Sequence, residues 1–177
     1  KHYYPRALDA YNKKDLNGLE PLLVESLIRA ESRYHTQAKS YVGAVGLMQI
    51  MPYTAFKISG RLQDYNFKVD NLWHLEKNLS YGLWYLANLF SYYKNNYVLA
   101  VAAYNAGPDA VNRWLHYCKG CDTDVFIELI PFKETRQYVK KIIVNYYRYL
   151  SLYSKEPSLS FLLPSLPKKI SRQHNLF

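Results

Sequence analysis

Apolar residues recur every three to four positions along most of this chain, and that spacing restricts the fold more than any other feature of the sequence. The stripe formed by Val24, Leu27 and Ile28 is typical of the pattern. Apolar residues with this period lie on one face of an amphipathic helix, whereas a half-buried strand alternates at every second residue. The pattern therefore predicts an all-α domain with few or no β-strands.

Glycine and proline residues mark where several of these helices begin and end. Gly107 and Pro108 close one helix and open the next, because glycine tolerates a left-handed conformation after a helix and proline fits the first helical turn. We expect helices over about residues 20–34, 71–93, 97–106 and 133–152, with shorter ones near residue 45, from residue 52 and after residue 122.

Length and composition suit one globular domain followed by a short arm. The chain has 177 residues, of which 49% are hydrophobic and 21% charged, enough to form a substantial core. Near the carboxyl end, Pro157, Pro164 and Pro167 interrupt an apolar stretch. We therefore predict a helical domain over residues 1–153 and a proline-containing arm over residues 154–177, which packs on the domain.

Charge and cysteine content argue against several classes of protein. Lysine and arginine outnumber aspartate and glutamate by 23 to 14, and the net charge of +9 suits an acidic polymer as partner. These cations are scattered and no nucleic-acid-binding motif is present, so we expect no nucleic-acid partner. Cys118 and Cys121 predict a local disulfide or two thiols rather than a metal site with His116. No apolar run approaches the roughly 18 to 20 residues that span a bilayer, so no transmembrane segment is expected.

A carboxylate closes the apolar stripe of the first strong helix. Glu31 stands seven residues after Val24 on the same face, where burial of a carboxyl raises its pKa toward the value that a general acid needs. The alternative is that Glu31 reaches solvent at a frayed helix end. Glu25 points off this face, four residues before Arg29, and is expected to form an ordinary exposed ion pair.

Two further segments place polar side chains at the end of apolar stretches. Gln49 follows Gly43 and Gly46 in an otherwise apolar segment, and the alternative interpretation is a satisfied core amide. Asn105 closes the stripe of the helix over residues 97–106, with Tyr104 beside it. An acid, two amides and an aromatic ring are typical of a carbohydrate-binding cleft.

Four segments of the chain, in order and in spacing, closely resemble the motifs of Slt-type soluble lytic transglycosylases. They are residues 28–33 (IRAESR), 43–52 (GAVGLMQIMP), 102–108 (AAYNAGP) and 130–139 (IPFKETRQYV), within a resemblance that runs from about residue 4 to about residue 149. It implies a lysozyme-like α-domain that cleaves the β-1,4 bond between N-acetylmuramic acid and N-acetylglucosamine in peptidoglycan. It also implies a periplasmic location, glycan strands as partner and no metal or other cofactor.

The resemblance assigns roles to individual residues. The single catalytic acid of the family falls on Glu31, and the substrate-binding residues fall on Ser32, Ser40, Met48, Gln49, Tyr104, Asn105, Glu134 and Tyr138. Ser32, Ser40 and Glu134 are equally well explained as a cap, a turn and a surface pair. In the implied reaction, Glu31 protonates the glycosidic oxygen and then takes a proton from the muramyl 6-hydroxyl, which closes a 1,6-anhydromuramyl end.

Two other functions stay open on the sequence alone. A second carboxylate across the cleft, from Asp64, Asp70 or Asp109, would favour hydrolysis by a lysozyme-like muramidase. A non-catalytic peptidoglycan-binding module would keep the sugar contacts without the chemistry. Whichever function holds, we expect the protein to be a monomer, with other cell-wall enzymes as candidate partners.

Overall fold

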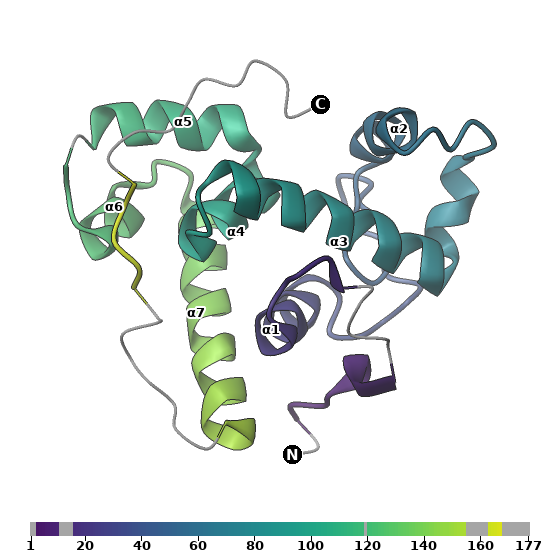
Figure 1. Ribbon diagram of the computed structural model, residues 1–177, viewed down its shortest axis with the longest axis horizontal. Coiled ribbons are helices and arrows are strands. Elements are labelled where there is room, and N and C mark those ends of the chain that lie inside the picture. The colour runs from purple at the N-terminus through teal and green to yellow at the C-terminus, as the bar shows by residue number, and fades with distance from the viewer. Residues whose placement is uncertain (1–2, 11–15, 119, 155–162, 168–177) are drawn as a thin grey trace. The chain divides into compact units, whose positions relative to one another are not determined.

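The structure of the protein is a computed structural model that describes residues 3–10, 16–118, 120–154 and 163–167 (Figure 1). Within these ranges the chain forms seven α-helices and two 3₁₀-helices. Pairing of extended backbone in the same ranges is limited to two isolated bridges, Lys39 with Val45 and Val45 with Ile50. The prediction of an all-α fold with few or no strands is therefore confirmed.

The chain separates into two compact units. Of the described residues, those within 6–87 form the amino-terminal unit, and those within 88–167 form the carboxyl-terminal unit together with residues 3–5. The boundary between them falls inside the long helix α3 (Leu75–Tyr92).

The amino-terminal unit contains η1 (Ala7–Ala10), α1 (Pro21–Glu31), α2 (Pro52–Arg61), η3 (Val69–Trp73) and the first part of α3. Helix α1 begins at Pro21, and Glu20 caps its amino-terminal end. The carboxylate of Glu20 accepts a hydrogen bond of 2.7 Å from the N–H of Leu23. The stripe of Val24, Leu27 and Ile28 is fully buried. The periodicity of the sequence thus correctly identifies the core-facing side of α1.

Two expected helices differ from the structure. Residues 39–50 form turns rather than a helix, and Gly43, Gly46 and Gln49 in this segment have positive φ angles of 93°, 80° and 49°. Left-handed residues cannot propagate a right-handed helix, so the prediction of a short helix near Val45 is wrong. The helix expected over residues 71–93 is split, because the extended backbone of His74 separates η3 from α3.

The carboxyl-terminal unit contains the end of α3, followed by α4 (Tyr97–Ala106), α5 (Pro108–Tyr117), α6 (Thr123–Leu129) and α7 (Lys133–Tyr153). Helix α4 packs against α5 and α7, and α6 also contacts both of these helices (Figure 1). Residues 97–103 of α4 are all buried, so α4 forms the centre of this unit. Gly107, with a φ of 82°, ends α4 and Pro108 begins α5, as the sequence predicts.

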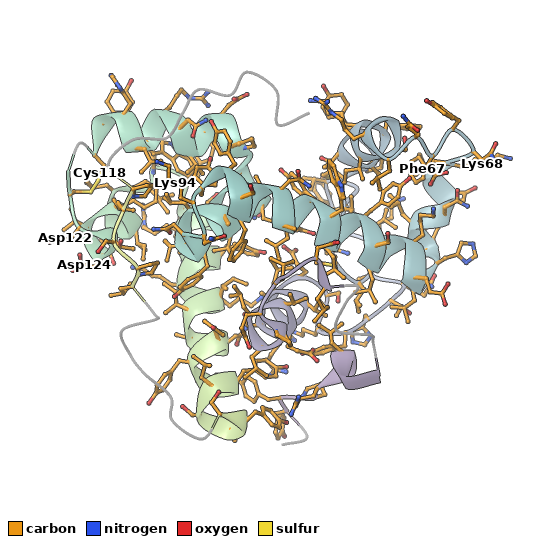
Figure 2. The ribbon with its side chains drawn as sticks, in the orientation of Figure 1. Phe67, Lys68, Lys94, Cys118, Asp122 and Asp124 are labelled. Carbon is orange, nitrogen blue, oxygen red and sulfur yellow. A yellow bond between two sulfur atoms is a disulfide. The ribbon has the colours of Figure 1, made fainter. Side chains whose placement is uncertain are left out.

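A disulfide between Cys118 and Cys121 closes the connection from α5 to α6 (Cys118 is labelled in Figure 2). The N–H of Cys118 also caps α5 by donating to the carbonyl of Trp114 at 3.0 Å. Because both sulfur atoms are in the disulfide, neither is available as a thiolate ligand, and the alternative of a metal site with His116 does not hold. Among the described residues, no helix combines the length and the hydropathy of a membrane-spanning segment.

Part of the predicted carboxyl-terminal arm contacts the carboxyl-terminal unit. The structure describes residues 163–167 of this arm beyond Ser154. The carbonyl of Pro164 accepts hydrogen bonds from Thr123 Oγ1 and Asn96 Nδ2, and the carbonyl of Ser165 accepts one from Asn96 Nδ2 at 3.1 Å. Asn96 also caps α4, since its Oδ1 accepts from the N–H of Leu99 at 3.1 Å. One buried amide therefore holds both the arm and the start of the central helix.

Candidate active site

Glu31 is the last residue of α1, and its side chain is half-buried. The helix ends here because Ser32 donates its N–H to the carbonyl of Ile28 at 3.0 Å, while Arg33 and Tyr34 follow with φ angles of 51° and 70°. Two successive left-handed residues turn the chain away from the helix axis. The carboxyl of Glu31 thus lies where a fully buried apolar stripe meets the surface.

The hydroxyl of Ser32 is buried and completes the helix cap. Its Oγ donates to the carbonyl of Ile28 at 3.4 Å and accepts from the N–H of Tyr34 at 3.1 Å. These bonds support the explanation of Ser32 as a capping residue. A role for Ser32 in binding substrate stays a prediction.

Glu25 was expected to be exposed in an ion pair with Arg29. That expectation of exposure is wrong, because the side chain of Glu25 is only 1% exposed. Its Oε1 accepts from the N–H of Leu8 at 2.7 Å, and its Oε2 accepts from Tyr34 Oη at 3.0 Å. The Tyr34 hydroxyl also lies 3.1 Å from the carbonyl oxygen of Glu25. The prediction fails because η1 and the segment after α1 bring donors to this side of the helix, which the periodicity of α1 itself cannot reveal.

The glycine-rich segment is folded around Asn78 of α3. This amide is 1% exposed, accepts from the N–H of Met48 at 2.8 Å, and donates to the carbonyls of Val45 and Leu72 at 2.9 Å each. Gly46 packs directly on it, since an added Cβ would lie 2.2 Å from Asn78 Nδ2. The sequence analysis did not identify Asn78, and its only signal there is a polar residue within the apolar pattern of the long helix.

Met48 joins the same loop to α3 by packing. Its side chain is fully buried, and a Cβ added to Gly82 would lie 2.4 Å from the Met48 sulfur. Gly82 therefore leaves the space that Met48 fills. The expected place of Met48 beside the cleaved bond stays a prediction.

Gln49 is half-buried and adopts a left-handed conformation, which is uncommon for a residue with a side chain. Its Nε2 donates to the carbonyls of Ala38 at 3.1 Å and Gly46 at 2.8 Å. Because these two bonds use both amide hydrogens, Oε1 is the atom of this amide that can accept a hydrogen bond from a sugar hydroxyl.

Ser40 closes a turn next to this loop. Its N–H donates to the carbonyl of Ala44, and its Oγ accepts from the N–H of Ala44, both at 2.9 Å. These two bonds support the explanation of Ser40 as a turn residue. An accepting hydroxyl keeps its own hydrogen as a donor, so the predicted contact of Ser40 with substrate is compatible with this geometry.

In the carboxyl-terminal unit, the exposed Asn105 lies in the last turn of α4, next to the half-buried Tyr104. The Oδ1 of Asn105 accepts a hydrogen bond of 2.6 Å from Thr135 Oγ1 on α7. This bond orients the amide and leaves its Nδ2 hydrogens as the donors that Asn105 can offer to an acetamido oxygen. Thr135 was missed by the sequence analysis, although it stands next to Glu134 in the fourth motif.

Glu134 and Tyr138 stand one turn apart on α7, yet their environments differ. Glu134 is exposed in the first turn of the helix, where a carboxylate favourably meets the helix dipole. Tyr138 is 9% exposed. The helix dipole is a structural reason for a carboxylate at position 134. The substrate-binding roles of Glu134 and Tyr138 stay predictions.

The aspartates considered as a second catalytic carboxylate all have structural explanations. Asp64 Oδ2 accepts hydrogen bonds from Lys77 Nζ and Tyr81 Oη, both at 2.7 Å. The bonds from Lys77 and Tyr81 lower the pKa of Asp64, which therefore stays ionised at neutral pH. Asp70 and Asp109 lie in the first turns of η3 and α5, where carboxylates are commonly found.

Comparison with known proteins identifies the family of this all-α domain. Residues 9–127 match the family model of the transglycosylase SLT domain. The chain is 41% identical over 133 residues to the soluble lytic murein transglycosylase of Escherichia coli K12, covering 70% of this chain and 20% of that protein. A putative soluble lytic murein transglycosylase of Haemophilus influenzae is 33% identical over 156 residues, covering 86% of this chain and 26% of that protein. The chain therefore belongs to the transglycosylase SLT domain family, and it spans about a fifth to a quarter of the length of these relatives.

Solved structures agree with this assignment. The lytic transglycosylase Slt of Pseudomonas aeruginosa, an inactive mutant with a glutamate-to-glutamine change, matches with a TM-score of 0.79 and 35% identity over 91% of this chain and 26% of that chain. The 70 kDa soluble lytic transglycosylase of Escherichia coli matches with a TM-score of 0.79 and 31% identity over 93% of this chain and 28% of that chain. The lysozyme-like fold class predicted from the sequence is thereby confirmed.

Proposed function

We propose that this chain is the catalytic domain of a peptidoglycan lytic transglycosylase, which cleaves the β-1,4 bond between N-acetylmuramic acid and N-acetylglucosamine. Membership of the SLT domain family carries the proposal, together with a half-buried glutamate, Glu31, at the end of α1. Its relatives are murein transglycosylases, and one of them is inactive as a glutamate-to-glutamine mutant. Because peptidoglycan lies outside the cytoplasm, we place the enzyme in the periplasm.

Glu31 serves as the single acid and then as the base. Its carboxyl gives a proton to the glycosidic oxygen while the bond from that oxygen to the anomeric carbon breaks. The carboxylate then takes the proton of the muramyl 6-hydroxyl, whose oxygen bonds to the same carbon and closes the anhydro ring. One proton is given and one is returned, so the reaction consumes neither water nor a cofactor. General acid catalysis of this kind contributes about 10²- to 10⁴-fold to the rate.

Two amides that are fixed by internal hydrogen bonds are the strongest candidates for binding the substrate. Ala38 and Gly46 hold the Nε2 of Gln49, and Thr135 holds the Oδ1 of Asn105. We assign Gln49 Oε1 to a sugar hydroxyl and Asn105 Nδ2 to the acetamido oxygen, because pre-oriented groups reorganise little during the reaction. The other proposed substrate-binding residues are Ser32, Ser40, Met48, Tyr104, Glu134 and Tyr138.

The hydrolytic alternative has less support. A muramidase with an activated water needs a second carboxylate, and Asp64 is engaged by Lys77 and Tyr81.

We further propose that the catalytic domain comprises residues 1–153, with residues 154–177 as an arm, and that it acts as a monomer alongside other cell-wall enzymes.

Digestion of purified peptidoglycan sacculi tests the proposed function, with turbidity and newly formed reducing ends followed together. A lytic transglycosylase clears the suspension without producing reducing ends. A muramidase produces one reducing end at each cleavage, and a binding module sediments with sacculi without clearing them. Either of the last two results would overturn the proposal.

A further inference from the structure

We propose that the outer face of α2 is an additional peptidoglycan-binding surface, on which a sugar ring stacks against aromatic side chains while cations meet the carboxylates of the peptide stems. This inference rests on the proposed function, because its ligand is the same polymer. The α2 face consists of Tyr53, Phe56, Lys57 and Arg61, which recur on one side of the helix. Tyr53 is 69% exposed and Phe56 is 53% exposed.

The ring of Phe56 is held from behind by a buried aromatic stack. It meets Phe67 edge to face, with ring centroids 5.4 Å apart, and Phe67 (labelled in Figure 2) lies 5.1 Å from the ring of Tyr81. Tyr81 is 1% exposed, and its hydroxyl donates to the carboxylate of Asp64. An exposed ring on a fixed support loses little conformational freedom when a ligand binds. Phe56 is therefore pre-organised as a platform.

Gly60 keeps the helix surface open one turn after Phe56. It is the penultimate residue of α2 and is exposed, and no atom outside the neighbouring backbone of the helix lies within 4 Å of the place where a Cβ would stand. A flat surface beside an exposed ring suits the close approach of a pyranose ring.

Cations border the aromatic rings of the α2 face. Lys57 Nζ lies 4.7 Å from the centroid of the Tyr53 ring, and the exposed Arg61 follows one turn later. Lys68, next to Phe67 and labelled in Figure 2, is also exposed. Asp64, three residues after Arg61, is paired with Lys77. The α2 face is thus complementary to a ligand that carries carboxylates.

This combination of groups favours peptidoglycan over a protein partner. Aromatic rings pack against the C–H face of a sugar, and the muramyl sugars carry peptide stems with carboxylates. A stable protein interface buries at least about 1,000 Å² around a cluster of apolar anchors. The α2 face offers two exposed rings bordered by cations, which suits repeated weak contacts along a polymer.

Binding assays with two probes test the inference. The first probe is intact sacculi, used in co-sedimentation, and the second is immobilised chitin, a β-1,4 glycan of N-acetylglucosamine that carries no carboxylates. All variants carry Glu31→Gln, so that the polymer is not cleaved during the assay. The test variants are Phe56→Ala and Lys57→Ala. The matched controls are Tyr117→Ala and Arg113→Ala, an exposed aromatic residue and an exposed cation four positions apart on α5.

The two test variants should differ in a defined way. Phe56→Ala should weaken binding to both probes by about three- to tenfold, because the stacking surface is lost. Lys57→Ala should weaken binding to intact sacculi alone, and the loss should shrink as the salt concentration rises. The two α5 controls should bind like the parent. If Phe56→Ala melts early, Phe56→Leu keeps an apolar contact with Phe67 while removing the ring, and should show the same loss.

The outcomes separate this inference from the proposed function. If Phe56→Ala and Lys57→Ala bind both probes as tightly as the α5 controls, the surface is overturned even when wild-type protein digests sacculi. If Lys57→Ala weakens binding to sacculi and to chitin equally, carboxylates are not its partner and that part of the inference is overturned. If binding depends on the α2 face but the wild-type protein releases no muropeptides, the proposed function is overturned and the inference about the α2 face is retained.

Discussion

Helix α1 carries two glutamates in contrasting environments. Glu25, in the middle of the helix, is 1% exposed and receives hydrogen bonds from Leu8 and Tyr34 on its two carboxylate oxygens. Glu31, at the end of the helix, is half-buried and so remains partly accessible. A buried carboxylate engaged by the protein on both oxygens is a structural group, whereas an acid catalyst must reach the substrate. Position on the apolar stripe does not by itself distinguish the two.

The two glutamates are also linked through the chain. Tyr34 follows Glu31 by three residues, and its hydroxyl reaches back to the carboxylate of Glu25. The structural carboxylate therefore holds the segment that immediately follows the proposed catalytic one. Substitutions at Glu25, Glu31 and Tyr34 should therefore separate effects on catalysis from effects on the free energy of unfolding.

The largest effect is expected for Glu31→Gln. This change keeps the size of the side chain but removes the transferable proton, so the release of soluble muropeptides should fall by about 10²- to 10⁴-fold. The melting temperature and the binding to sacculi should be preserved. Activity within about tenfold of wild type would show that Glu31 is not the acid.

The second largest effect is expected for Glu25→Leu, and it should appear in stability. The buried N–H of Leu8 would lose its acceptor, which costs about 1–3 kcal/mol, and the hydroxyl of Tyr34 would lose the carboxylate and keep the backbone carbonyl of Glu25 as its acceptor. Urea denaturation should therefore show a loss of about 2–5 kcal/mol in the free energy of unfolding. An unchanged denaturation midpoint would instead support the exposed position that the periodicity suggested.

Glu25→Gln should have an intermediate effect. The amide keeps one acceptor oxygen for the N–H of Leu8 but loses the charge and the second acceptor, so the free energy of unfolding should fall by about 1–2 kcal/mol. The specific activity of the folded protein should stay near the wild-type value. A loss of activity as large as that of Glu31→Gln would contradict the division of roles between the two glutamates.

The smallest effect is expected for Tyr34→Phe, which removes one hydroxyl and leaves the ring. Its cost should be about 0.5–1.5 kcal/mol in the free energy of unfolding. Added to Glu25→Leu, the same change should cost less than it does alone, because the shared hydrogen bond is already lost. Fully additive effects in this double-mutant cycle would mean that the bond between Tyr34 and Glu25 contributes nothing.

The parts of the fold that depend on local periodicity could be predicted from the sequence. The stripe of Val24, Leu27 and Ile28 is fully buried, and Gly107 and Pro108 separate α4 from α5 as expected. The segment near Val45 was predicted as a short helix because its apolar spacing resembles one. The left-handed conformations of Gly46 and Gln49 fold it as a loop instead.

The residues that hold the candidate site in place were harder to find. Glu25, Asn78 and Thr135 each act through a hydrogen bond to another element of the same unit. The period of their own helices does not predict these bonds, because the partners Leu8, Met48 and Asn105 lie at least 17 residues away in the sequence. Motif resemblance, in contrast, pointed to Glu31, Gln49 and Asn105 without any knowledge of these supports.

The most direct test of the proposed chemistry is mass spectrometry of muropeptides released from sacculi in heavy-oxygen water. If the muramyl 6-hydroxyl is the acceptor, each product should be lighter by one water than the hydrolysis product and should carry no solvent oxygen. A positioned hydroxyl has an effective concentration far above that of a diffusing nucleophile, which favours this internal route. Products dominated by reducing-end muropeptides labelled with heavy oxygen would contradict the transglycosylase mechanism and show that water is the acceptor.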